Sequence, residues 1–309
     1  MLFYRIYCTR QFTETKYKFI YDKSILKSIA GFSGWSLFAN GAIALNSQGI
    51  LLLINMFFNP AVVAARSISI QVNMAINQFV GNFRTAVNPQ IVKKYAAGDI
   101  KGSQKLLLES TKYSYYMMFL LCFPICLLAR PILELWLGVV PEYTVIFLQL
   151  IMIQSLFQVF DTSFYTALYA KGQLRENALI SPTVLFVVFP IVYIFFKIGA
   201  SPVVLSWITM IAYALLGLVI KPILIVKIAG YRWKDICNIF KPCITVTLCS
   251  LPIPLFITSH IDTLHIINFI IMIIVTILTT CCSIYWVGID KETKIKTKSF
   301  IRNKCNFMF

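Results

Sequence analysis

The sequence predicts an all-α, polytopic integral membrane protein with about eight transmembrane helices in four hairpins. Hydrophobic residues occupy 59% of the 309 positions, and the mean hydropathy is +0.77. Only 13% of the residues are charged, whereas a soluble domain would carry about a quarter. In addition, 25 of the 28 Lys and Arg residues fall on alternate connections between long apolar stretches. This alternation is typical of helices that cross a bilayer repeatedly.

Each span is predicted from an apolar window close to the length that crosses the hydrocarbon core, about 20 residues. The predicted spans are residues 34–57, 61–83, 114–135, 145–168, 178–197, 203–226, 243–259 and 265–287. The connections at residues 59–60, 136–144, 198–202 and 260–264 are short, so the spans that they join are expected to pair as hairpins.

The basic residues also predict the orientation. They gather in the N-terminal segment, in residues 84–113, 171–175 and 221–241, and after residue 287. The opposite connections, residues 59–60, 136–144, 198–202 and 260–264, contain no Lys or Arg. Because positive residues are retained on the cytoplasmic side, both termini are predicted to be cytoplasmic.

We therefore divide the chain into four parts. These are a basic cytoplasmic segment (1–30), a six-helix transmembrane lobe (31–230), an additional transmembrane helix pair (231–287) and a basic cytoplasmic tail (288–309). Within the long basic connection, Pro89 is expected to end or kink a helix. Residues Ser103–Ser110 are amphipathic and are expected to form a separate helix lying on the membrane surface.

Composition argues against several classes of function. The net charge of +16 comes from loops beside apolar spans, so we expect contact with anionic membrane lipid and no nucleic acid. The nine cysteines contain no CxxC pair, and two histidines cannot build a metal set. The chain shows no glycine-rich phosphate loop and no catalytic constellation, so we expect no enzyme activity and no cofactor.

Polar side chains recur along the second predicted span. One stripe comprises Arg66, Asn73, Asn77 and Arg84, which fall within about 40° of one line at 3.6 residues per turn. A second stripe on a different face comprises Gln71, Gln78 and Asn82, and the first span adds Asn40 and Gln48.

Polar groups inside a membrane need partners, so we interpret this hairpin as the wall of a hydrophilic chamber. The candidate substrate-binding residues are Arg66, Asn73, Asn77, Arg84, Asn40 and Gln48. The alternatives are that the amides only join neighbouring helices, and that Arg84 only follows the charge bias of a cytoplasmic helix end.

Asp161 is a carboxylate well inside a predicted span. Such a group can bind a coupling proton or cation, which makes it the coupling-ion candidate. The alternative is a structural role, either in an ion pair with Lys171 or Arg175 or in a hydrogen bond to Thr162.

Four stretches carry a family resemblance. They are Asn59-Pro60 with Ala61–Gln71 (AVVAARSISIQ), Ala86–Asp99 (AVNPQIVKKYAAGD), Ile132–Gly138 (ILELWLG) with Pro141-Glu142-Tyr143, and Tyr169–Gln173 (YAKGQ). In this order and spacing, residues 28–230 resemble the polysaccharide transporters, the O-antigen flippase-like group of the multidrug/oligosaccharidyl-lipid/polysaccharide exporter superfamily.

The resemblance implies a transporter of the bacterial cytoplasmic (inner) membrane. It would flip undecaprenyl-pyrophosphate-linked oligosaccharide by alternating access for polysaccharide or lipopolysaccharide biosynthesis, with glycosyltransferases as possible partners. By position, Arg66 matches the cationic residues that line the cavity in that family.

The chain departs from the family in size. Members have two six-helix lobes, and this chain resembles the C-terminal lobe plus a helix pair. We therefore expect a truncated or split form that needs an N-terminal lobe or a second subunit. Two other functions stay open: a cation-coupled multidrug exporter of the same superfamily, and a non-transporting membrane scaffold for glycan assembly.

Overall fold

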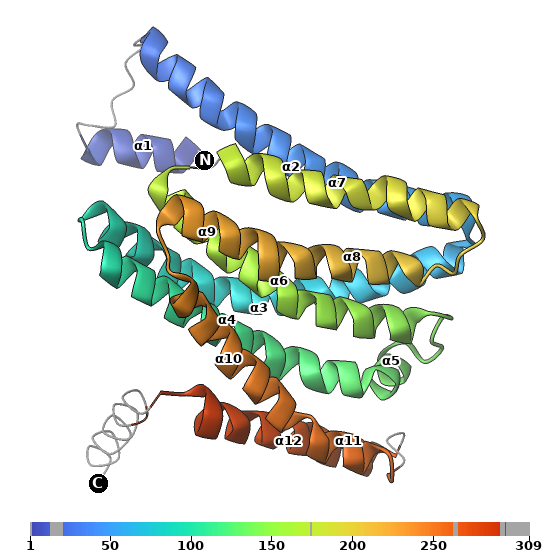
Figure 1. The fold of residues 1–309 in the computed structure, drawn as a ribbon. Helices are drawn as coiled ribbons and strands as arrows, with labels where there is room; N and C mark the ends of the chain where they lie inside the picture. Colours follow the sequence, from blue (N-terminus) through green and yellow to red (C-terminus); the bar gives the residue numbers. More distant parts are fainter. Residues whose placement is uncertain (1, 13–20, 174, 262–264, 291–293, 295–309) are drawn as a thin grey trace.

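The computed structural model describes residues 2–12, 21–173, 175–261, 265–290 and 294, and in these ranges the chain forms helices and no strands (Figure 1). The helices are α1 (Leu2–Gln11), α2 (Lys23–Phe57), α3 (Pro60–Ala96), α4 (Ile100–Leu127), α5 (Ala129–Leu137), α6 (Thr144–Lys171), α7 (Arg175–Lys197), α8 (Val204–Leu215), α9 (Lys221–Ala229), α10 (Trp233–Ser250), α11 (Pro252–Thr258) and α12 (Ile266–Ser283). Two π-helical turns, η2 (Leu216–Ile220) and η3 (Ile284–Gly288), continue α8 and α12.

Five of the described helical segments are long and apolar enough to cross a membrane, or six if a bent pair counts as one span. They are Thr144–Lys171, Leu179–Lys197, Val204–Ala229, Trp233–Thr258 and Ile266–Gly288, and the bent pair is α4 with α5, which meet at 75°. This all-helical, apolar architecture indicates a membrane protein. The helix α3 is not among the candidates, because polar residues recur along its length.

The long helices run side by side, and their connections gather at two ends of the bundle (Figure 1). The connections α3–α4, α6–α7 and α9–α10 share one end. The connections α2–α3, α5–α6, α7–α8 and α11–α12 share the other end (Figure 1). The basic connections of the sequence therefore lie together.

Local chemistry explains where the helices α3 and α4 begin. The Asn59 side chain accepts the Val62 N–H at 3.1 Å, and Pro60 occupies the first turn, where its missing N–H costs no hydrogen bond. The Asp99 carboxylate accepts a hydrogen bond from the Gly102 N–H at 2.9 Å and forms an ion pair with Lys94 at 3.3 Å. Both interactions favour the charged carboxylate and hold the pKa of Asp99 below its ordinary value.

Two clusters of buried side chains hold the bundle together. The larger joins α3, α4, α6 and α10, with Phe119, Leu148 and Phe164 among its buried members. The smaller ties α2 and α7 to the rest through residues such as Ile54 and Val192. Gly217 in η2 lies directly against the backbone of α6, where a Cβ atom would overlap the Phe157 carbonyl oxygen.

The structure contradicts one of the two alternatives for Pro89, a helix end, and also the expectation for Ser103–Ser110. Pro89 does not end its helix, because α3 continues to Ala96. Residues Ser103–Ser110 are not a separate surface helix, since they form the first turns of α4. Ser103 is buried and donates to the Ile91 carbonyl at 2.8 Å, which ties the start of α4 to the end of α3.

Candidate functional site

A band of polar side chains lies between α3, α6 and the helix formed by α8, η2 and α9, with contacts between these helices at several points along it. We call this band the polar seam. Its members are Arg66, Asn73, Asn77 and Arg84 of α3, Gln154, Ser155, Gln158, Asp161 and Thr162 of α6, and Ser206 and Lys221 of α8 and α9. The first predicted stripe of α3 therefore faces other helices.

Arg66 lies at one end of the seam and is only 5% exposed. Its Nη1 donates to the Ser206 hydroxyl at 3.0 Å, and its guanidinium lies 5.8 Å from the Phe147 ring centroid. Its Nε has no hydrogen-bond partner in the described structure. Sequence reasoning favoured a place for Arg66 beside an open cavity. In this structure it is instead packed between α3, α6 and α8.

Asn73 and Asn77 occupy the middle of the seam, where both are half-buried. The Asn77 amide donates to the Asn73 side-chain oxygen at 2.7 Å, and the Ser155 hydroxyl donates to the same oxygen at 2.5 Å. Gln154 and Gln158 lie on the same side of α6, and the Oε1 atom of each is buried without a hydrogen-bond partner among the described residues. Buried polar atoms are nearly always paired, so these unpaired atoms are unusual.

The other end of the seam holds a cluster of charges. Arg84 of α3 donates to the Thr162 hydroxyl. Asp161 forms an ion pair with Lys221 of α9 at 3.2 Å, and the Lys221 side chain is 2% exposed. The Lys221 Nζ also lies 5.6 Å from the Tyr165 ring centroid.

Sequence reasoning missed the partner of Asp161. It offered Lys171, Arg175 and Thr162, and it assigned Lys221 to a basic cytoplasmic connection. The structure places Lys221 inside the segment Val204–Ala229 and pairs it with Asp161. A signal was present, because Lys221 falls within the predicted span 203–226 and a cation there needs a counter-charge.

The remaining predicted site residues lie apart from the seam. Gln48 of α2 is exposed. Asn40 also belongs to α2, and its side chain lies outside the described residues. The second stripe of α3, formed by Gln71, Gln78 and Asn82, is exposed along the outside of the helix, with Gln78 donating to Asn82 at 3.1 Å.

A cavity of about 660 Å³ adjoins the charged end of the seam. Its lining includes Asn88 and Lys93 from α3 and Tyr165 and Tyr169 from α6. Tyr165 connects the two features, because its ring also contacts Lys221. The cavity thus combines a cation, an amide and two aromatic rings at the end of the bundle that carries the basic connections.

The polar seam contains groups that can bind polar ligands. Among the described residues, no group of three or more His, Cys, Asp and Glu side chains could hold a metal ion. The seam offers cations, amides and hydroxyls, which recognise phosphate and sugar groups through hydrogen bonds.

Comparisons with protein families, with curated proteins and with solved structures find no match to this chain. The case for a function therefore depends on the residues themselves.

Proposed function

We propose that this chain is one lobe of a transporter that flips undecaprenyl-pyrophosphate-linked oligosaccharide across the bacterial cytoplasmic membrane. The observation that carries the proposal is the polar seam, in which Arg66 Nε, Gln154 Oε1 and Gln158 Oε1 are buried and have no hydrogen-bond partner in the part of the chain that the structure describes. Unpaired donors and acceptors inside an apolar bundle destabilise this state, and we explain their presence by a second state in which they bind substrate. Alternating access supplies such a state, because it opens a packed seam to substrate and closes it again.

The cavity beside the seam supports the same function. Lys93 suits a pyrophosphate, and Asn88 suits sugar hydroxyls. Tyr165 and Tyr169 present flat, amphipathic faces against which a sugar ring can pack. In this proposal the headgroup first occupies the cavity and then enters the seam, where Arg84 is the first cation that it meets.

The exposed stripe of α3 supports the need for a second lobe. Amides in contact with lipid are destabilising because lipid offers no hydrogen bonds. Gln71, Gln78 and Asn82 therefore need a polar neighbour, which an N-terminal lobe or a second subunit would supply together with the opposite wall of the chamber. The proposal includes eight spans with both termini in the cytoplasm.

The test is glycan export in the cell of origin, where any partner is present. The double variant Arg66→Ala/Asn73→Ala should abolish export while the protein remains in the membrane at the parent level. The matched control is Ser67→Ala/Met74→Ala, on the same helix and outside the seam. Accumulation of lipid-linked oligosaccharide on the cytoplasmic side would identify the blocked step.

Two outcomes would favour the other candidates. Full export by the Arg66→Ala/Asn73→Ala variant would contradict the flippase and favour a scaffold for glycan assembly. Drug efflux in place of glycan export, lost on Asp161→Asn, would favour the cation-coupled exporter. The ion pair of Asp161 with Lys221 argues against that exporter, because the carboxylate is already neutralised by the protein.

A further inference from the structure

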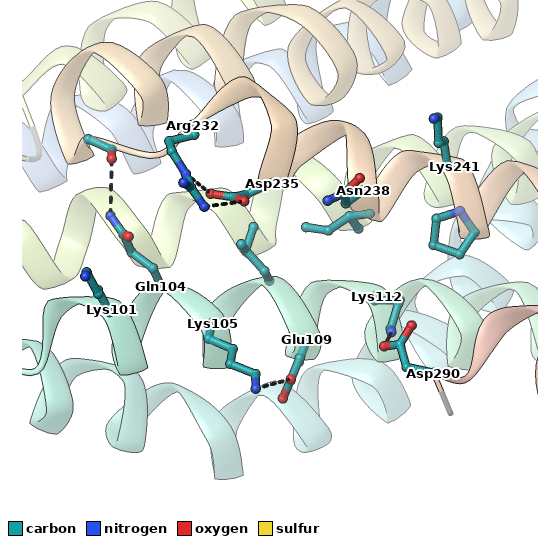
Figure 2. A pocket seen from close by; sticks show the side chains of 14 residues that line it. Lys101, Gln104, Lys105, Glu109, Lys112, Arg232, Asp235, Asn238, Lys241 and Asp290 are labelled. Carbon is teal, nitrogen blue, oxygen red and sulfur yellow. Dashed lines mark hydrogen bonds and ion pairs between the residues drawn. The ribbon is translucent and has the colours of Figure 1, made fainter. Parts of the chain in front are cut away.

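A second, separate cavity of about 1000 Å³ lies between α4, the start of α10 and the end of the described C-terminal segment (Figure 2). It belongs to neither the polar seam nor its adjoining cavity, since none of their residues line it. Its walls are strongly charged, with five Lys and Arg side chains and three carboxylates.

Each carboxylate of this cavity is already engaged by a cation. Asp290 pairs with Lys112 at 2.7 Å, and Glu109 pairs with Lys105 at 3.9 Å. Asp235 accepts two hydrogen bonds from the Arg232 guanidinium, at 3.0 and 3.1 Å (Figure 2). These three pairs neutralise three of the five cations.

Two cations are left over. Lys101 and Lys241 are exposed, and neither has an ion-pair or hydrogen-bond partner within the described part of the chain. They lie at opposite ends of the row of charged side chains in Figure 2. The amide of Asn238 stands between them and can hydrogen-bond an anion without adding charge. The cavity therefore has a surplus of two positive charges, with the Asn238 amide between them.

The position of the cavity relative to the candidate membrane spans indicates what kind of ligand can reach it. Its residues Gly230 and Arg232 lie between the candidate spans Val204–Ala229 and Trp233–Thr258, where we place the membrane surface. Trp233 is exposed at the same level, as interfacial tryptophans are. A ligand with a negatively charged headgroup and an apolar tail fits this position better than a freely diffusing anion.

We propose that this cavity binds the phosphodiester headgroup of an anionic phospholipid, with Lys101 and Lys241 as the cations that hold it. Such a site would fix the angle between α10 and α4, because the bound headgroup bridges both helices. It is independent of transport and would exist even if the polar seam moved no substrate.

The test is binding of short-chain phosphatidylglycerol to the full-length chain in neutral detergent, measured by native mass spectrometry. Phosphatidylcholine and inorganic phosphate are the comparison ligands. Phosphatidylglycerol should bind and raise the unfolding temperature, and the other two should bind far more weakly. Equal binding of phosphatidylcholine would overturn the proposal, and equal protection by inorganic phosphate would show a site for a free anion instead.

Charge variants locate the site. Lys101→Gln/Lys241→Gln should weaken phosphatidylglycerol binding about 30-fold, since each lysine near anionic lipid contributes roughly a fivefold change in affinity. Lys227→Gln/Lys234→Gln removes the same charge from the same end of the bundle, outside the cavity, and should leave the affinity nearly unchanged. An equal loss in both double variants would overturn the site, because it would show only diffuse attraction.

A gain-of-binding variant keeps the test independent of folding defects. Glu109→Gln removes an exposed carboxylate and frees Lys105, so phosphatidylglycerol should bind about fivefold more tightly. Unchanged or weaker binding by this variant would contradict the proposed headgroup position.

Discussion

The ion pair between Asp161 and Lys221 offers the sharpest test of the packing between α6 and α9. The change is Asp161→Asn, which removes the charge and keeps the shape of the side chain. Lys221, 2% exposed, then loses its counter-charge, while Arg84 still brings a second positive charge to the same cluster. An unneutralised ammonium in an apolar bundle is strongly destabilising.

The magnitude follows from the geometry. At the observed separation of 3.2 Å, two unit charges attract by about 5 kcal/mol at an effective dielectric constant of about 20. The contact between the Lys221 ammonium and the Tyr165 ring is present in both proteins, so it does not change the difference between them. We therefore expect the variant to lose about 3–5 kcal/mol of unfolding free energy, the range found when one partner of a buried pair is removed.

The assay is equilibrium unfolding in mixed micelles, followed by tryptophan fluorescence. The control is Asp161→Asn/Lys221→Met, in which neither charge remains, and it should lie within about 1 kcal/mol of the parent protein. The difference between single and double variants isolates the pair. A single variant as stable as the parent would refute the reasoning, because it would mean that water reaches Lys221 and solvates it.

Two further predictions concern backbone packing and helix capping. Gly217→Ala should lower the unfolding free energy by about 1–3 kcal/mol in the same assay, because the new Cβ would overlap a backbone carbonyl of α6. The control is Gly81→Ala, whose Cβ would meet no atom within 4 Å, so this variant should be neutral or stabilising. Equal effects of the two changes would contradict the close contact at Gly217. Asp99→Ala should speed amide hydrogen exchange at the start of α4 at neutral pH, since the carboxylate caps that helix. Gly102 and Lys94 lower the pKa of Asp99, so its stabilisation is present above the ordinary carboxyl pKa and lost as the pH falls through the lowered one. The exchange difference between variant and parent should shrink over that acidic range, and a constant difference would contradict the capping role.

Much of the helical framework could be predicted from the sequence because apolar runs and turn residues are local signals. The predicted span 145–168 corresponds to α6, and the predicted span 265–287 corresponds to α12 with η3. The extent of α4 could not be predicted in the same way. Its first turns are held by the hydrogen bond from Ser103 to Ile91, a contact between two helices.

The candidate site also has a part that local sequence signals predict and a part that depends on contacts between helices. Helical periodicity alone determined that α3 carries two polar stripes on different faces, since side-chain angles follow from the 3.6-residue repeat. Only the tertiary structure decided which stripe packs against other helices: the stripe of Arg66 and Arg84 contacts α6 and α8, and the stripe of Gln78 and Asn82 stays exposed. It also decided that Lys221 is the ion-pair partner of Asp161. The physical reason is that a repeat fixes angles around one helix axis, whereas burial and charge pairing depend on which neighbouring helix occupies each angle.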